Sequence, residues 1–272
     1  MFHNHHSHSY YSLLDGYSSP EELIKRAADI GMSALSITDH GSLSGHRELV
    51  KAANEYGVKP ILGLEAYFTT DRLDKRSKKE RTPDDQIYNH LIVLAKDDTG
   101  LDNLNRLSEN AWEEGFFVKP RTDFDMLEKY SDGLVVLSGC MNGIISKALE
   151  NNNETLAKQY AGWFRDVFGE DFYIEIQPHN PAPLNIALLN LADSGGIKSV
   201  VTLDCHYAAP EDRVAEEIML ILGTHPKIDK ESDFGKSRKI KDLMERLDYL
   251  YGERQMSFRD LDIWLMNYAD VI

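Results

Sequence analysis

The stretch SPEELIKRAADIGMSALSITDH (residues 19–40) predicts one helix and the short strand that follows it. Ser19 has the side chain of an N-cap, Pro20 suits the first helical position, and Glu22 suits the capping box. The apolar run ALSITDH (34–40) then predicts a buried strand that ends in two polar side chains. Units of this kind build α/β folds with a mostly parallel sheet.

The same alternation of short apolar runs and amphipathic segments recurs along the chain. The sequence contains no Gly-rich phosphate loop of the G-x-G-x-x-G or Walker type, and this favours a barrel over an open doubly wound sheet. We therefore expect an α/β fold with a seven-stranded, TIM-like barrel. Its strands are expected at 2–8, 34–40, 59–69, 90–97, 133–140, 172–177 and 199–207. Further helices are expected at about 44–56, 99–115, 144–168, 181–195 and 210–222.

Composition narrows the function. The chain has 272 residues, 42% of them hydrophobic, and we expect one large α/β domain. A net charge of −15 argues against holding nucleic acid by bulk electrostatics, so phosphate chemistry would need local positive charge, for which metal ions are the obvious source. Two cysteines, Cys140 and Cys205, with no leader and no long apolar run, predict a cytoplasmic protein that does not enter a membrane.

Side chains that bind metals stand in the first predicted strand and at the ends of others. His6 and His8 are two apart on a strand, so both leave the same face, together with Asn4. His5 then faces the other way, and His3 is incidental. A purification tag would be a contiguous histidine run, whereas this cluster continues directly into SYYSLLDG. The alternation therefore predicts a chelating pair, His6 and His8.

The other strand ends carry matching chemistry. Asp39 and His40 end the second strand, Glu65 the third and Cys140 the fifth, and the seventh holds Asp204-Cys205-His206. The ends of parallel barrel strands meet at one mouth, so imidazole, carboxylate and thiol groups should meet there. Alternation puts Asp204 and His206 on one face and turns Cys205 away. Each residue alone is more often structural, but the joint pattern predicts a metal centre.

The motifs also carry a family resemblance. HSHSYYSLLDG, LSITDHGSLSG, KPILGLEAY, YNHLIVLAKD, EGFFVKPRTD, GLVVLSGC, YIEIQPHN and TLDCHY occur in that order. They resemble the polymerase-and-histidinol-phosphatase (PHP) domain, in the version found at the N-terminus of the α subunit of bacterial DNA polymerase III. The resemblance runs from residue 1 to about 222. It implies a distorted seven-stranded barrel over 1–222, and a loop and short helical extension over 223–272 that in the family leads toward the polymerase core.

The resemblance further implies a set of nine metal ligands and three divalent metal ions. The ions would be Zn²⁺, Mn²⁺ or Fe²⁺, with Mg²⁺ as a further option. Two of the ligands, Asp15 and His90, rest on the resemblance alone. The nine residues are His6, His8, Asp15, His40, Glu65, His90, Cys140, Asp204 and His206.

Phosphoester hydrolysis is the reaction that this centre predicts. We assign Asp204, Glu65 and His206 to catalysis, and the carboxylates can bridge ions. The polymerase-type resemblance implies a 3′→5′ exonuclease on a DNA 3′ end, next to the rest of a replicative polymerase. The chain shows no likeness to the acidic residues of a polymerase palm, so we do not expect DNA synthesis. Two alternatives stay open: a small-molecule phosphomonoesterase, and a structural module stabilised by its metals.

Contacts to the substrate can be predicted only loosely. Lys119 and Arg121 in FVKPRTD would contact phosphate, although surface salt bridges explain them equally well. The loop DRLDKRSKKER (71–81), dense in basic residues, either follows a DNA backbone or is solvated. Tyr10 and Tyr11 either stack on a base or belong to the core.

Overall fold

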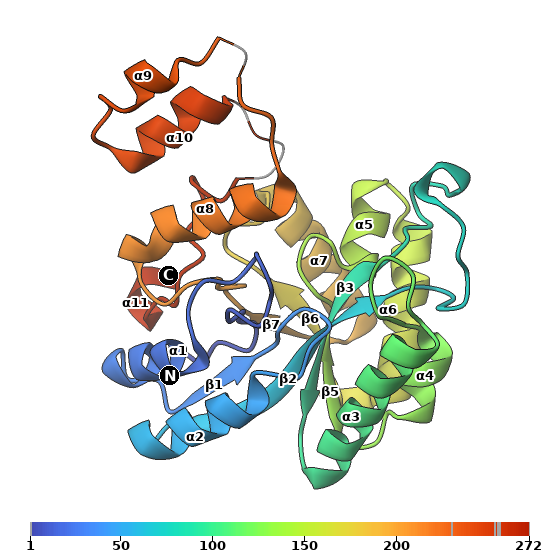
Figure 1. The fold of residues 1–272 in the computed structure, drawn as a ribbon. Helices are drawn as coiled ribbons and strands as arrows, with labels where there is room; N and C mark the ends of the chain where they lie inside the picture. Colours follow the sequence, from blue (N-terminus) through green and yellow to red (C-terminus); the bar gives the residue numbers. More distant parts are fainter. Residues whose placement is uncertain (1, 230, 253, 255–256, 272) are drawn as a thin grey trace.

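The computed structural model describes residues 2–229, 231–252, 254 and 257–271. Within these ranges seven strands form one curled sheet, a half-barrel with helices around it (Figure 1). The strand order is β1-β2-β3-β5-β6-β7, with β4 paired to β2. The strands are β1 (Ala34–Ile37), β2 (Lys59–Phe68), β3 (Asn89–Ala95), β4 (Arg121–Thr122), β5 (Leu134–Leu137), β6 (Phe172–Ile176) and β7 (Lys198–Val201).

All the helices expected from the sequence are present, and one of them is divided in two. The capping box of α1 is confirmed, because Ser19 accepts from the Glu22 backbone and Glu22 accepts from the Ser19 N–H. The helix expected at 144–168 is two helices, separated at Asn151–Asn153, where Asn152 has a left-handed φ of 58°. The α-helices are α1 (Pro20–Asp29), α2 (His46–Tyr56), α3 (Asp98–Glu113), α4 (Phe124–Lys129), α5 (Ile144–Glu150), α6 (Glu154–Phe168), α7 (Ala182–Gly195), α8 (Arg213–Thr224), α9 (Phe234–Ser237), α10 (Leu243–Tyr251) and α11 (Tyr268–Val271).

The N-terminal segment is not the strand we expected at residues 2–8. Its one bridge, among the described residues, is Ser7 to Cys205. The segment nevertheless lies between β1 and the chain after β7, because Thr38 N donates to Ser7 O (2.8 Å) and His8 N donates to Cys205 O (2.7 Å). The Asn4 side chain replaces regular ladder bonds, since its Oδ1 accepts from Leu203 N and its Nδ2 donates to His6 O. Backbone bonds on both sides and the Asn4 side chain therefore hold this segment in place without regular sheet.

One strand runs against the direction that a simple βα barrel would give. β3 is antiparallel to both β2 and β5, whereas the other pairs are parallel. The start of β3 therefore lies beside the carboxyl end of β2, where Tyr67 is opposite His90. This topology explains how a residue at the beginning of a strand can reach the same mouth as residues at the ends of other strands.

Two regions of buried apolar side chains hold the sheet and its helices together. The larger one joins β2, β3, β5 and β6 to α3, α5, α6 and α7, with Phe68, Phe164 and Phe172 among its largest side chains. The smaller one joins α1, α2 and β1 to Leu203 and Cys205, and to Leu265 in the segment near the C-terminus. Cys205 therefore packs in the core, and the prediction that it points away from Asp204 and His206 is confirmed.

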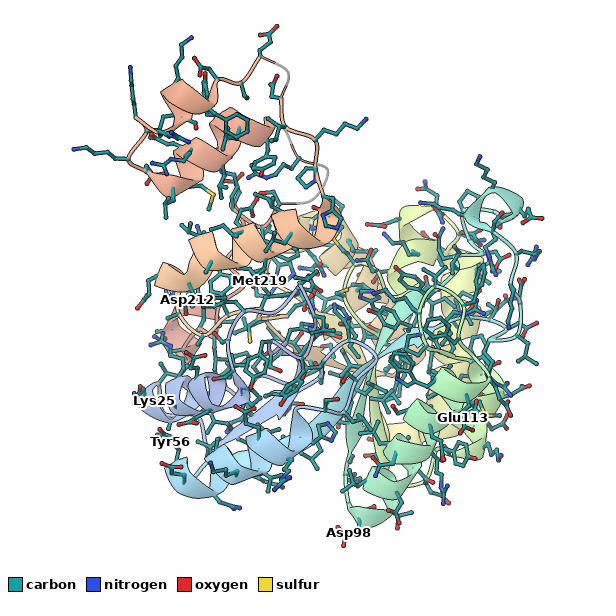
Figure 2. All side chains as sticks on the ribbon, viewed as in Figure 1. Lys25, Tyr56, Asp98, Glu113, Asp212 and Met219 are labelled. Carbon is teal, nitrogen blue, oxygen red and sulfur yellow. The ribbon has the colours of Figure 1, made fainter. Side chains whose placement is uncertain are left out.

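The residues after 222 only partly form a separate extension. Helices α9 and α10 stand apart from the sheet beyond α8 (Figure 1), and their polar side chains extend into solvent (Figure 2). The chain then returns, since Leu265 N donates to Tyr207 O and Ile263 O accepts from His206 N. Among the described residues, no helix has the length and apolar character that crossing a bilayer requires.

Candidate metal centre

The structure brings all nine predicted ligands together, and Glu65 lies at their centre. Glu65 is at the buried end of β2, with its side chain only 1% exposed. Its carboxylate lies within 4 Å of an imidazole nitrogen from each of His6, His8, His40 and His90. We call the nine residues the mouth; they are His6, His8, Asp15, His40, Glu65, His90, Cys140, Asp204 and His206.

The first group of ligands comes from the N-terminal segment and the turn after β7. The Nε2 atoms of His6 and His8 lie 3.1 Å apart, and Asp204 Oδ1 lies 3.0 Å from the first and 3.1 Å from the second. Asp204 has a left-handed φ of 49°, unusual outside glycine and asparagine. Because β7 ends at Val201, this turn, and not strand alternation, directs Asp204 and His206 into the mouth.

The second group surrounds the other side of Glu65. His40 Nδ1 lies 2.7 Å from Glu65 Oε2, and His90 Nδ1 lies 2.9 Å from Glu65 Oε1. Cys140 completes this side, with its Sγ 3.7 Å from His90 Nδ1 and 4.0 Å from Glu65 Oε1. The two oxygens of Glu65 therefore contact different sets of ligand atoms.

The third group lies at the outer side of the mouth. His40 Nε2 is 2.6 Å from Asp15 Oδ2, and His206 Nε2 is 3.8 Å from the same oxygen. The rings of His8 and His206 lie 4.6 Å apart. In three groups the ligand atoms are close enough to share an ion. These groups are His6, His8 and Asp204; His40, Glu65 and His90; and His8, His40 and His206.

The charges within the mouth depend on one another. Burial would raise the pKa of Glu65, but the imidazoles of His40 and His90 hold it well below its usual range. Burial would lower the pKa of His40, but Glu65 and Asp15 raise it to about 10. Burial raises the pKa of the Cys140 thiol. In the metal-free protein, imidazolium protons thus neutralise the carboxylates, and binding cations would displace those protons.

The sequence of this chain matches a known protein family. The sequence model described as "PHP domain" matches residues 4–179. The chain belongs to the PHP-domain family. The matched region contains seven of the nine residues of the mouth, and Asp204 and His206 follow it.

Relatives of this PHP domain include DNA polymerase III α subunits. That of Aquifex aeolicus is 37% identical over 98% of this chain and 24% of its own length. Those of Borreliella burgdorferi and Treponema pallidum are 39% and 42% identical over 82% and 80% of this chain, and 19% of their own length in each case. The chain thus spans about a fifth to a quarter of these relatives.

Solved structures share the fold at low sequence identity. A protein from Bifidobacterium adolescentis, named as a candidate metal-dependent phosphoesterase, matches with a TM-score of 0.50 and 16% identity over 75% of this chain and 87% of its own. An amidohydrolase from Chromobacterium violaceum matches with a TM-score of 0.51 and 15% identity over 77% and 89%. These likenesses show the fold of the PHP domain.

A second layer of residues orients the histidines of the PHP domain. His6 Nδ1 donates to Glu175 (2.7 Å). Ser12 donates its hydroxyl proton to Asp39 and can therefore accept from His8 Nδ1 (2.9 Å). His206 Nδ1 donates to its neighbouring carbonyl at Asp204 (2.8 Å). In all three rings the Nδ1 proton is used, which leaves Nε2 as the ligand atom.

Sequence reasoning did not assign a role to Glu175 or Ser12. Glu175 is fully buried in the otherwise apolar strand β6, where Thr202 and Gln177 also donate to it. A carboxylate inside an apolar run was the available signal, because burying one without partners is costly. Ser12 gave no signal, because serine is common in turns.

The two predicted phosphate contacts differ in their surroundings. Lys119 is partly exposed, and its ammonium lies 5.0 Å from the centre of the Tyr67 ring at the mouth. Arg121 is fully buried, and its guanidinium donates to the carbonyls of Gly115, Asp74, Ile87 and Arg72. This placement does not fit a phosphate contact, because a substrate cannot reach the guanidinium. Arg121 instead fixes the loops beside the mouth.

The donor atoms fit divalent ions. The separations of 3.0–3.1 Å among His6, His8 and Asp204 are close to the roughly 3.3 Å that bonds of about 2.0–2.1 Å set between ligands of a tetrahedral ion. His40 Nδ1 and Glu65 Oε2 are buried without a hydrogen-bond partner, because the ring N–H does not align with the oxygen. Imidazole, carboxylate and thiol together suit first-row divalent ions.

A groove of about 1040 Å³ opens beside the mouth. Asp15, His40 and His90 line its floor, and α8 borders it with Leu220. This volume lies at the upper end of the range of about 300–1000 Å³ that small-molecule pockets occupy. The groove has room for a substrate larger than a small phosphate ester.

Proposed function

We propose that this PHP domain is a metal-dependent phosphodiesterase that removes nucleotides from the 3′ end of DNA. The observation that carries the proposal is the convergence of the nine residues of the mouth, seven of which form three groups whose ligand atoms are close enough to share an ion. Three groups support three divalent ions, of Zn²⁺, Mn²⁺ or Fe²⁺, with Mg²⁺ as a further option. All nine residues are proposed to be ligands.

Bound ions would supply positive charge to the phosphate and a water of lowered pKa as nucleophile. The chain's own residues hold and orient that chemistry. Glu65 has ligand atoms beside both of its oxygens, and Asp204 lies beside both His6 and His8, so both carboxylates would hold ions when these are bound. His206 lies at the outer side of the mouth near Asp15. We propose Glu65, Asp204 and His206 as the catalytic residues for this reason.

The DNA substrate and the setting rest on the relatives and the groove. The α subunits of DNA polymerase III align with most of this chain, which supports a role beside the rest of a replicative polymerase in the cytoplasm. The groove volume favours a polynucleotide over a small monoester. Lys119 is proposed to contact the substrate, whereas Arg121 is left out of the proposal because it is buried.

A direct assay tests the proposal. Purified protein is supplied in turn with Zn²⁺, Mn²⁺, Fe²⁺ and Mg²⁺, and release of nucleotides from a single-stranded oligonucleotide is compared with turnover of p-nitrophenyl phosphate, a monoester. We expect release from the 3′ end, and loss of it in His8→Ala. Preferred turnover of the monoester would indicate a phosphomonoesterase. Bound metal without hydrolysis under any ion would indicate a structural module.

A further inference from the structure

Two exposed aromatic side chains form a shelf beside the groove. Trp112 and Phe116 are 54% and 47% exposed, and their rings stack 5.6 Å apart at an angle of 20°. Both line the groove that opens beside the mouth. We call this pair the Trp112–Phe116 shelf. Large aromatic side chains are normally buried, so an exposed stacked pair beside a candidate active site calls for a ligand.

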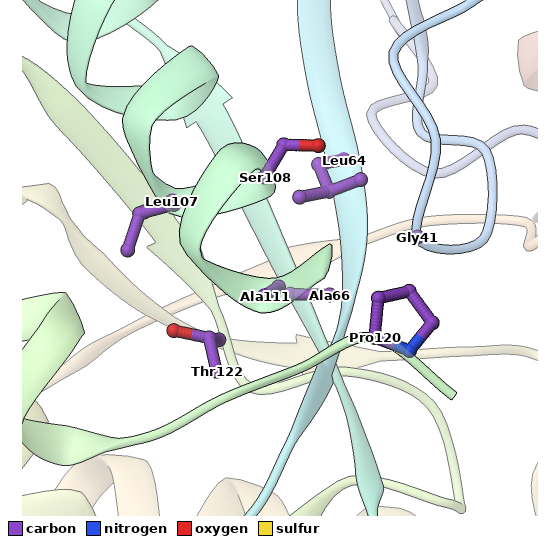
Figure 3. A pocket seen from close by; sticks show the side chains of 8 residues that line it. All are labelled: Gly41, Leu64, Ala66, Leu107, Ser108, Ala111, Pro120 and Thr122. Atoms are coloured by element: carbon purple, nitrogen blue, oxygen red, sulfur yellow. The ribbon is translucent and has the colours of Figure 1, made fainter. Parts of the chain in front are cut away.

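The shelf is held at a fixed position relative to the metal ligands. Trp112 Nε1 donates to Gly41 O (3.1 Å), and Gly41 directly follows the ligand His40. Below the shelf, Leu107 and Ala111 of α3 pack over β2, and the space between them is only about 10 Å³ (Figure 3). Figure 2 labels Asp98 and Glu113 at the two ends of α3, and the shelf lies at the Glu113 end.

The turn after the shelf is also fixed. A side chain at Gly115 would lie 2.0 Å from Arg121 O, so only glycine fits there. Arg121 binds the carbonyl of the same glycine from inside the molecule. Val118 is 58% exposed and has φ 67°, a conformation that β-branched residues rarely adopt. Strained backbone of this kind concentrates at ligand sites.

A cation lies between the shelf and the mouth. Lys119 Nζ is above the Tyr67 ring, which lies 5.7 Å from the rings of both His40 and His90. Within the described ranges, no carboxylate lies within 4 Å of this ammonium. Lys78 is a further cation along the groove. Stacking surfaces combined with cations are the features by which proteins bind single-stranded nucleic acid without base specificity.

We propose that the Trp112–Phe116 shelf stacks the unpaired bases of a DNA strand whose terminal phosphodiester lies in the mouth, with Lys119 on the adjoining phosphate. The inference rests on the proposed function and adds to it that the substrate end is single-stranded. A paired end would keep its bases stacked on one another, so it could not use the shelf. Stacking on an aromatic side chain contributes a factor of about 5 to 100 in affinity per base.

The test compares two substrates on the Mn²⁺-loaded protein. One is a single-stranded oligodeoxythymidylate, and the other is thymidine 5′-p-nitrophenyl phosphate, which has no neighbouring base for the shelf. In Trp112→Ala/Phe116→Ala we expect KM for the oligonucleotide to rise about 5- to 100-fold. The ratio of oligonucleotide to nitrophenyl-ester activity should fall by the same factor. Trp112→Phe, which keeps an aromatic face, should stay within about 3-fold of the wild type.

Phe234→Ala is the matched control, because Phe234 is also an exposed aromatic residue (56%) but lies on α9, away from the mouth. It should leave both activities unchanged. Oligonucleotide should also quench tryptophan fluorescence in the wild type and not in Trp112→Phe. An unchanged KM in the double variant would overturn the shelf while the exonuclease stands. Quenching without hydrolysis would overturn the exonuclease and keep the shelf, and absence of both would overturn both.

Discussion

The mouth and the charged loop (residues 71–85) are both dense in ionisable side chains, but their pairing differs. In the loop, Arg76 pairs with Asp74 (2.7 Å) and Asp85 (2.8 Å), and Arg81 pairs with the same two carboxylates (3.1 and 2.9 Å). These arginines and aspartates therefore satisfy one another. In the mouth, buried imidazoles and carboxylates present their ligand atoms to one another, and the rings are oriented from behind by further hydrogen bonds.

This difference separates a binding site from a stabilised loop. The loop's arginines are engaged by its own aspartates, which favours the solvated loop over a DNA contact, although Lys78 still faces the groove. The mouth has several ligand atoms around each shared position, which an ion would satisfy better than protons do. A count of charges in the sequence does not distinguish the two cases, whereas burial and pairing do.

An Asp→Asn substitution should abolish most hydrolysis in the mouth and leave it nearly unchanged in the loop. This difference in activity is the largest expected effect. Asp204→Asn removes the carboxylate shared by His6 and His8. We expect hydrolysis to fall by more than about 100-fold, since even the loss of a partner behind a metal ligand costs about 10- to 100-fold. Asp74→Asn in the loop is the control and should stay within about 2-fold. Equal activity of the two variants would break the comparison.

Chelation should destabilise the protein through the mouth alone. At a free metal concentration 100 times the dissociation constant, a single ion contributes about 2.7 kcal/mol to folding. We expect dialysis against a chelator to lower Tm by about 5–10 °C. Differential scanning calorimetry of Asp204→Asn should show a smaller decrease. A wild-type Tm that does not respond to chelation would contradict bound structural metal.

Glu216 sharpens the comparison, because it is a buried carboxyl without a partner. It lies on α8 near the mouth, is fully buried, and neither oxygen has a hydrogen-bond partner. Burial raises its pKa to about 8, despite the opposing effect of His206. The folded state therefore holds this proton more tightly than the unfolded state, and the stability of the metal-free protein should fall as pH rises from about 4.5 to 8.

Glu216→Gln removes this titration. Urea unfolding of the metal-free variant should give a stability within about 1 kcal/mol of the wild type near pH 5 and about 4–5 kcal/mol above it at pH 9. The neighbouring Glu217 provides the contrast, because it pairs with buried Arg254 at 2.6 Å and accepts from Ser257. Glu217→Gln should therefore destabilise the protein. A pH-independent effect of Glu216→Gln would contradict the raised pKa, because it would show that folding does not change the proton affinity of this carboxyl.

The smallest effect is expected for stability in the charged loop. Asp74 is held by Arg76 and Arg81 near the surface, and hydrogen bonds from Arg76 lower its pKa to about 2. Solvent screens the pair with the half-exposed Arg76, and the buried Arg81 keeps its bonds to the backbone carbonyls of Asp74 and Gln86 after the substitution. Thermal unfolding of Asp74→Asn should give a Tm within about 3 °C of the wild type. A decrease as large as that caused by chelation would mean that the loop supports the mouth.

Much of the fold and the site could be predicted from the sequence. The capping box at Ser19 and the apolar runs gave the helix and strand pattern, and the histidine, carboxylate and cysteine side chains that meet at the mouth were named in advance. Cys205 was correctly predicted to point away from Asp204 and His206. The helices, the strands and the positions of His40, Glu65 and Cys140 could be predicted because they depend on local periodicity and on where strands end, whereas Asp15 and His90 were predicted from the family resemblance alone.

Other features depend on contacts between distant segments. His90 reaches the mouth only because β3 is antiparallel, and hydrophobic periodicity does not encode strand direction. Residues 2–8 lack regular sheet because Asn4 bonds to Leu203, about 200 positions away. Arg121 is buried because carbonyls from the connection between β2 and β3 and from the turn after α3 converge on it. Long-range hydrogen bonding of this kind leaves no periodic signal in the sequence.

The central claim is that the nine residues of the mouth, with Glu65 at their centre, form a metal centre. Elemental analysis of the purified protein, after equilibration with Mn²⁺ or Zn²⁺ and removal of free ions, tests it most directly. Three groups of ligands predict up to three ions per chain in the wild type and in Asp74→Asn, and fewer in His8→Ala and Asp204→Asn. The same low metal content in the wild type and in the two mouth variants would contradict the account.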